Sequence, residues 1–173
     1  NPTWSPIFAT DDQDTDTGNY YGFYFRVGTN KQLDITFGNG VSAGGDGRRS
    51  YGGGPEIPVG QWTHVAATVN GPEEMKAYVN GIEISGVYSG SATTMAHNNT
   101  YTARIGRMTR YGPFYMNGAV DSLRIYSRVL SASEVIANYQ AGMIEFQTRT
   151  GATGSPNDGS WEEWKPTNSE SQL

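Results

Sequence analysis

The chain has 173 residues, of which 36% are hydrophobic and 17% charged, and its formal net charge is −5. This acidic balance argues against a nucleic-acid-binding protein, because phosphate neutralisation needs a basic surface. The absence of cysteine excludes a disulfide framework and thiolate metal sites. No apolar run approaches the ~20 residues needed to span a bilayer, so membrane insertion is not expected. The 23 glycines and 11 tyrosines favour an all-β protein with short strands and tight turns.

Hydrophobic residues alternate with a period of two in several short segments, which predicts half-buried β-strands. The predicted strands, in chain order, are Gly22–Val27, Gln32–Phe37, Trp62–Val69, Met75–Val79, Ile82–Ser85, Thr102–Ile105 and Ala119–Tyr126. Asn-Gly occurs four times, and this dipeptide suits two-residue hairpin turns because both positions tolerate a positive φ. The strongest hairpin prediction is Asn80-Gly81, which has strand residues on both sides.

One helix is predicted at Ala132–Ala141. Ser131 is a favourable N-cap residue, and Glu134 three residues later completes a capping box. Leu130 and Val135 occupy the positions of a hydrophobic staple. Gly142 follows the last helical residue, where glycine commonly stops a helix.

The character of the sequence changes after Gly142. Met143–Thr148 reads as one more strand, and the turn-rich stretch Gly151–Ser160 follows it. We therefore expect a first domain at residues 1–142. Residues 143–173 are expected to form an extra strand, a linker or the start of a following β module.

Two segments resemble the laminin-G-like family, which is related to pentraxins and legume lectins. The first is Gly60–Gly71 (GQWTHVAATVNG), followed by Ala77–Gly81 (AYVNG). The second is Ile105-Gly106, followed by Gly118–Ser131 (GAVDSLRIYSRVLS). The resemblance implies an antiparallel jelly-roll β-sandwich of the concanavalin-A-like type with one short C-terminal helix, and a place in a prokaryotic-type surface protein.

The resemblance also implies that this sequence begins partway through the fold. Family members usually open with strands that have no counterpart here, and residues 1–8 resemble the stretch after them. The sequence does not begin with Met, so we expect a processed product or an excerpt. A sandwich without its opening strands would expose a sheet edge and apolar core. Ile144–Thr148, or a strand from another subunit, is expected to fill that place.

Catalysis is not expected. A glycosidase needs two carboxyl groups a fixed distance apart, and the E-x-D-x-x-E pattern of glucanases with this fold is absent. The adjacent pair Glu73-Glu74 would point to opposite faces if it lay on a strand. His64 belongs to the family's strand motif and His97 lies in a polar loop, so structural roles are expected for both.

Calcium is the most credible cofactor. Asp12, Asp14 and Asp16 alternate in an acidic loop, and Ca²⁺ prefers carboxylate and carbonyl oxygens. The loop departs from the EF-hand pattern, because Thr17 holds the position of the turn glycine and Phe23 that of the closing glutamate. A solvated acidic loop is the alternative reading.

Asp121 is a second candidate metal ligand. In proteins that the chain resembles, the aspartate of the G-x-I-D motif often helps to bind a structural Ca²⁺ with oxygens near the opening strand. A hydrogen bond from Asp121 to a neighbouring loop is the alternative. The segment between Ile105 and Gly118 contains no carboxylate, which makes a pentraxin-like double calcium site unexpected.

The expected function is that of a non-catalytic extracellular or cell-surface binding or adhesion module within a larger protein. Its expected partner is a glycan or a surface protein. Aromatic residues near loops could serve as sugar platforms or could cover the core: Tyr20, Tyr21, Tyr51, Tyr88, Tyr111 and Tyr115. The alternative function is a structural subunit of a surface assembly or filament, which self-associates when a neighbouring chain completes its sandwich.

Overall fold

The computed structural model describes residues 4–12, 18–98, 101–109 and 113–142, together with the strand residues 147–148 and 165–166. The elements are β1 (Ser5–Asp12), β2 (Phe23–Val27), β3 (Leu33–Gly38), the 3₁₀ turn η1 (Gly45–Gly47), β4 (Arg48–Gly53), β5 (Val65–Val69), β6 (Met75–Val79), β7 (Ile82–Glu83), β8 (Gly86–Gly90), β9 (Thr102–Ile105), β10 (Arg107–Met108), β11 (Phe114–Tyr115), α1 (Ala132–Ala141), β12 (Gln147–Thr148) and β13 (Lys165–Pro166).

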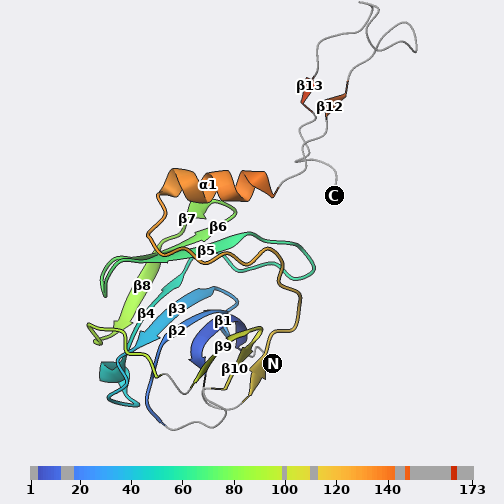
Figure 1. Cartoon of the computed structure of the whole chain (residues 1–173). Coiled ribbons are helices and arrows are strands. Elements are labelled where there is room, and N and C mark those ends of the chain that lie inside the picture. The colour runs from blue at the N-terminus through green and yellow to red at the C-terminus, as the bar shows by residue number, and fades with distance from the viewer. Residues whose placement is uncertain are drawn as a thin grey trace, which may run out of the picture.

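Two antiparallel sheets form the layers of a β-sandwich (Figure 1). The larger sheet has six strands in the order β8-β4-β3-β2-β1-β9, and the smaller has three in the order β5-β6-β7. The pairs β10–β11 and β12–β13 form separate two-stranded ribbons. Helix α1 lies on the outer side of the smaller sheet, against the β6–β7 turn. The predicted all-β jelly-roll sandwich with one short helix is therefore confirmed.

The hydrophobic core lies between the two sheets. Strand alternation directs Leu33, Ile35 and Phe37 of β3 inward, and each is at most 2% exposed. Val65, Ala67 and Val69 of β5 pack against the same core from the smaller sheet. Burial of these faces is the main favourable term that holds the layers together.

Tyrosine hydroxyls tie the core to the backbone. Tyr51 Oη donates to the carbonyl of Ile84 at 3.1 Å and accepts from the amide of Gly86 at 2.9 Å. Tyr88 Oη accepts from the Met75 amide at 2.9 Å. Tyr51 and Tyr88 thus act as core residues with satisfied hydroxyl groups, rather than as loop platforms.

The hairpin between β6 and β7 confirms the turn prediction. Asn80 and Gly81 have φ values of 50° and 79°, so both central residues adopt the left-handed conformation of a type I′ turn. Val79 pairs with Ile82 across this turn.

Two strand predictions need correction. The predicted strand Trp62–Val69 begins only at Val65, and Trp62 is 74% exposed. The segment Ala119–Tyr126 alternates like a strand but belongs to none of the sheets. A strand needs a partner for its backbone groups, and no described residue supplies one beside this segment. Strands β1, β4 and β8 were not predicted, because glycine and polar residues interrupt their apolar alternation.

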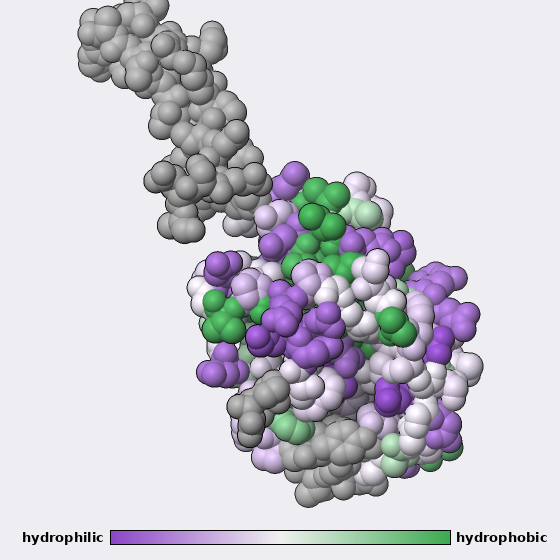
Figure 2. Space-filling view, turned by 180° about the vertical axis from the view of Figure 1, so that it is seen from behind, coloured by the Kyte–Doolittle hydropathy of each residue, from purple (hydrophilic) through white to green (hydrophobic). Residues whose placement is uncertain are grey.

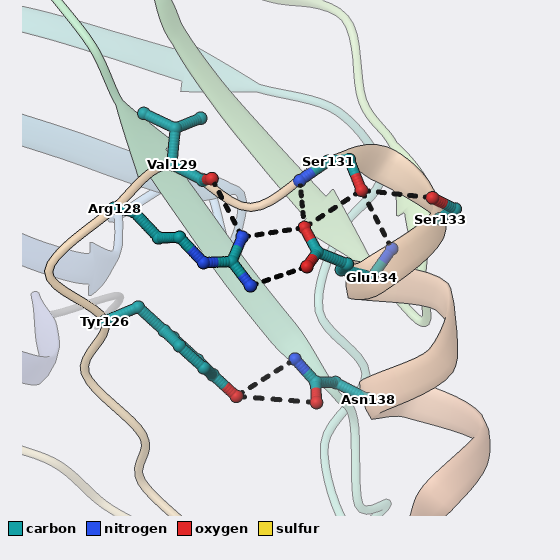
Figure 3. A network of polar contacts seen from close by, with 7 residues as sticks. All are labelled: Tyr126, Arg128, Val129, Ser131, Ser133, Glu134 and Asn138. Atoms are coloured by element: carbon teal, nitrogen blue, oxygen red, sulfur yellow. Dashed lines mark hydrogen bonds and ion pairs between the residues drawn. The ribbon is translucent and has the colours of Figure 1, made fainter.

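Helix α1 begins with the predicted capping box (Figure 3). Ser131 Oγ accepts from the Glu134 amide at 3.3 Å, and the Glu134 carboxylate accepts from the Ser131 amide at 2.9 Å. Arg128 adds a two-pronged ion pair with Glu134, with distances of 2.6 and 2.9 Å. Gly142 ends the helix as predicted, although its φ of −87° is right-handed rather than left-handed.

Helix α1 ends at Ala141, beside the predicted boundary at Gly142, and the division into two parts stays a prediction. Of the segment after it, the structure describes only β12 and β13, which pair antiparallel. The predicted strand Met143–Thr148 overlaps β12, and its first four residues lie outside the described residues, as does Gly151–Ser160. Among the described residues, no helix has the length and apolar character that crossing a lipid bilayer requires.

The first prediction concerns the N-cap. We expect Ser131→Ala to destabilise the protein by about 1 kcal/mol, because the Glu134 amide loses its acceptor. Urea unfolding followed by circular dichroism measures the change. Ser127→Ala is the matched control, since Ser127 is an exposed serine just before the helix, and it should leave the unfolding midpoint unchanged. Equal midpoints for Ser131→Ala and the wild type would contradict this role of the cap.

The second prediction concerns pH. Arg128, followed by the Ser131 cap, lowers the pKa of Glu134 from 4.5 to about 2. A carboxylate whose pKa is depressed by folding stabilises the folded state above its unfolded pKa. This contribution should be complete above pH 4.5 and should disappear as the pH falls towards 2. Thermal unfolding of the wild type and Glu134→Gln should therefore differ at neutral pH and converge at pH 2; a constant difference would contradict the assignment.

Candidate functional site

The outer face of the six-stranded sheet carries a row of polar side chains. Register places these residues side by side, because Tyr24 pairs with Thr36, Thr36 with Ser50, and Ser50 with Ser89. Arg26 pairs with Asp34 one step along the same face. The inward neighbours on β2 and β3 are apolar, so strand alternation separates the polar surface from the core there, whereas β4 places Arg49 in the inward phase, over the Tyr88 ring.

These side chains form one chain of hydrogen bonds across four strands. Arg26 donates to Asp34 at 3.2 Å, and the Thr36 hydroxyl donates to Asp34 at 2.9 Å. The hydroxyls of Thr36 and Ser50 lie 2.8 Å apart. Arg48 then donates to Ser50 at 2.7 Å and to Ser89 at 3.1 Å. We call the set Arg26, Asp34, Thr36, Arg48, Ser50 and Ser89 the outer polar row.

The two arginines of the row differ in their partners. Arg26 forms an ion pair with Asp34, and its guanidinium carbon lies 3.7 Å from the centre of the Trp4 ring. Arg48 contacts only the neutral hydroxyls of Ser50 and Ser89 and makes no ion pair with a described carboxylate. Because its charge is not neutralised locally, Arg48 is the position in the row best suited to an anionic group.

One half of this outer face is covered. Ala9, Tyr20, Tyr24 and Met108 form a small buried cluster there, and Trp4 and Phe114 pack against it. Arg26 donates to the sulfur of Met108 at 3.5 Å, while its Nε is buried without a hydrogen-bond partner.

The other half, over β4 and β8, is more open. Ser89 is exposed there, and the neighbouring Val87 is 78% exposed. A ligand could therefore approach the row from the Arg48 side, while the Trp4 side stays packed.

Asp121 is the one predicted metal ligand whose side chain the structure describes. Asp121 is exposed, and its carboxylate accepts a hydrogen bond from the amide of the next residue, Ser122, at 2.7 Å. Asp12 ends β1, whereas Asp14 and Asp16 lie outside the described residues. In the part of the chain that the structure describes, no three acidic or histidine side chains gather as a metal site would require. The calcium sites remain predictions.

The tyrosines predicted as sugar platforms have different environments. Tyr20, like Tyr51, is buried, and Tyr21 packs edge-on against Tyr101 with ring centres 6.0 Å apart. Tyr115 is 62% exposed, and Tyr111 lies outside the described residues.

Sequence reasoning did not identify the outer polar row. Its signal is the polar phase of the alternation in β3, Asp34 and Thr36, but the polar residues of β4 and β8 join it only through register.

The histidines lie apart from this row. His64 is half-buried beside β5, and burial lowers its pKa, with a smaller lowering from the nearby Arg124. Its ring lies 5.7 Å from that of Tyr139, and its Nδ1 is buried without a hydrogen-bond partner. His97 is exposed.

Comparison with known proteins bears on this fold directly. Residues 1–136 match the family model described as the concanavalin A-like lectin/glucanases superfamily. No curated protein matches the sequence. Among solved structures, the chain is similar to a crystal structure of an S-layer domain-containing protein from Clostridium thermocellum, with 22% sequence identity and a TM-score of 0.42.

The similarity to that structure covers 80% of this chain and spans 64% of the length of the other. The family match covers most of the 173 residues and includes both sheets of the sandwich. The chain therefore belongs to the concanavalin A-like lectin/glucanase superfamily.

Proposed function

We propose that this protein is a non-catalytic saccharide-binding module of an extracellular or cell-surface protein, and that the outer polar row is its binding site. The observation that carries the proposal is the position of Arg48. Its guanidinium has only hydroxyl partners and lies at the open end of a hydrogen-bonded row. Membership of a lectin-containing superfamily supports the same ligand class.

The row has the chemistry of saccharide recognition. The exposed hydroxyl of Ser89 can donate and accept a hydrogen bond, which matches the hydroxyl groups of a sugar, and the buried hydroxyl of Ser50 holds Arg48 in place. Arg48 adds a cation that favours an acidic group, such as a carboxylate or a sulfate. The rigid sheet holds these side chains in a fixed arrangement, which reduces the entropy lost on binding.

The composition of the row also supports a non-catalytic role. It contains one carboxylate, Asp34, and this carboxylate is engaged by Arg26 and Thr36. A glycosidase of the usual kind needs two carboxyl groups on either side of the scissile bond. An adhesion role at a surface would follow from saccharide binding without turnover.

The third prediction tests this site. A glycan array that includes acidic and neutral oligosaccharides should identify acidic ligands, and Arg48→Ala should weaken their binding by about tenfold or more. Arg48→Lys should retain part of the affinity, because it keeps the charge but loses the planar donor pair. Isothermal titration calorimetry measures each affinity.

The matched control is Lys31→Ala. Lys31 is an exposed cation that pairs with Glu56 at 3.1 Å, away from the row, so its removal should leave binding unchanged. Equal affinities for wild type and Arg48→Ala would contradict the site. Release of reducing ends from a bound oligosaccharide would contradict the non-catalytic role.

A further inference from the structure

The hydrogen bonds of the outer polar row have a direction, which begins with Asp34. This carboxylate is paired with Arg26, and its oxygens can only accept hydrogen bonds. The bond of 2.9 Å between Thr36 and Asp34 therefore uses the one hydrogen of the Thr36 hydroxyl. The hydrogen in the contact of 2.8 Å between Thr36 and Ser50 then comes from Ser50. The carboxylate thus decides which way both hydroxyl groups point.

Arg48 continues the row in the same direction. A guanidinium can only donate, so Nη1 of Arg48 is the donor in its bond of 2.7 Å with Ser50. The Ser50 oxygen is free to accept this bond because its own hydrogen points to Thr36. Every hydrogen bond from Arg48 to Asp34 therefore runs the same way. Hydrogen bonds aligned in a chain polarise and strengthen one another.

The open end of the row presents hydrogen-bond donors. Nη1 of Arg48 also donates to Ser89 at 3.1 Å, and no described residue accepts the hydrogen of the Ser89 hydroxyl. A guanidinium has five N–H groups, and the bonds to Ser50 and Ser89 both come from Nη1. The Nε and Nη2 groups of Arg48 have no side-chain partner among the described residues. A carboxylate or a sulfate, whose oxygens accept without donating, matches this end of the row.

Burial protects the direction of the row from solvent. Thr36 is 1% exposed and Ser50 is 6% exposed, so water cannot easily offer their hydroxyl groups other partners. Ser89, at the open end, is exposed. The inner hydroxyls are therefore oriented before a ligand arrives, which lowers the cost of binding.

The apolar surface of the molecule lies on the other layer. In Figure 2, hydrophobic surface gathers towards the α1 end of the molecule. Helix α1 lies on the outer side of the smaller sheet, whereas the row belongs to the six-stranded sheet. A polar ligand on the row is thus separate from that apolar surface.

We propose that Asp34 and Thr36 are positioning residues of the saccharide site, and that they orient the row so that Arg48 and Ser89 bind the oxyanion of an acidic saccharide. The inference rests on the proposed function for its ligand class and adds two residues that do not touch the ligand. Thr36 acts through Ser50, and Asp34 acts through Thr36. A neutral sugar hydroxyl fits this end less well, because its own hydrogen has to be placed among donors.

The first experiment uses inorganic sulfate as the probe, so it does not depend on a glycan. The whole chain is titrated with sodium sulfate, and the arginine Nε–H signals are followed by NMR, with sodium chloride at equal ionic strength as the salt control. The Arg48 signal, assigned with Arg48→Ala, should shift and saturate with sulfate alone. Thr36→Val should weaken sulfate binding by about threefold or more, because Ser50 loses its acceptor and Arg48 loses a polarised partner.

Two further variants separate positioning from packing. Thr36→Ser keeps the hydroxyl group and should bind sulfate like the wild type, although it removes a buried methyl group. The matched control is Thr68→Val, a buried threonine on β5 in the other sheet, which should also bind like the wild type. Circular dichroism confirms that each variant is folded.

A second measurement needs no variant. Buried hydroxyl protons exchange slowly with water, so those of Thr36 and Ser50 should be visible by NMR at low temperature. Nuclear Overhauser contacts should place the Ser50 proton beside Thr36 and the Thr36 proton beside Asp34. A Thr36 proton directed at Ser50 would contradict the proposed direction.

The outcomes separate this inference from the saccharide site. The absence of a saturable sulfate shift at Arg48 would overturn the inference, as would equal sulfate binding by the wild type and folded Thr36→Val. Acidic oligosaccharides that bind equally to these two proteins would overturn the positioning roles while leaving the saccharide site intact. A glycan array without any acidic ligand would contradict saccharide binding, but the sulfate titration would still support the directed row.

Discussion

Backbone hydrogen bonding between neighbouring strands is the constraint on which the rest of this structure depends. Every N–H and C=O group removed from water needs a partner, and an antiparallel sheet provides partners on both sides of each inner strand. The six-stranded sheet meets this demand from β4 to β1. The three-stranded sheet has a single inner strand, β6. The end strands of both sheets have one partner each: β8 and β9 in the larger sheet, and β5 and β7 in the smaller.

The alternation of side chains along each strand then assigns the chemistry of each face. In β3 the residues Leu33, Ile35 and Phe37 enter the core, while Asp34 and Thr36 lie on the opposite side. The neighbouring strands repeat this division in register, so isolated polar residues become a continuous hydrogen-bonded row. The register of β4 with β3 and β8 places Arg48 at the open end of that row. A shift of one residue would move it into the core.

The segment between β11 and α1 is held to the helix by side-chain contacts, and among the described residues its backbone pairs with no strand. Its side chains bond to α1, through Arg128 with Glu134 and through Tyr126 with Asn138. These contacts span only 6 to 12 residues along the chain and fix where the segment lies. They do not satisfy its backbone, because side chains on one face leave the lateral N–H and C=O groups free. The segment is thus positioned as a strand without being paired as one.

The sequence by itself determined the features that depend on interactions between residues close together in the chain. Ser131 and Glu134 form a cap within four residues, and Asn80-Gly81 forms a turn through its own backbone preferences, so both were predictable. The apolar faces of β2, β3 and β5 followed from alternation, and the family motifs in residues 60–131 identified the sandwich. Only the tertiary structure decided which strands are neighbours. It therefore decided that Ser50 and Ser89 join Thr36 in one row, that Tyr51 and Tyr88 serve the core, and that residues 119–126 stay unpaired. The physical reason is that register and pairing connect residues far apart in the chain, which no local pattern encodes.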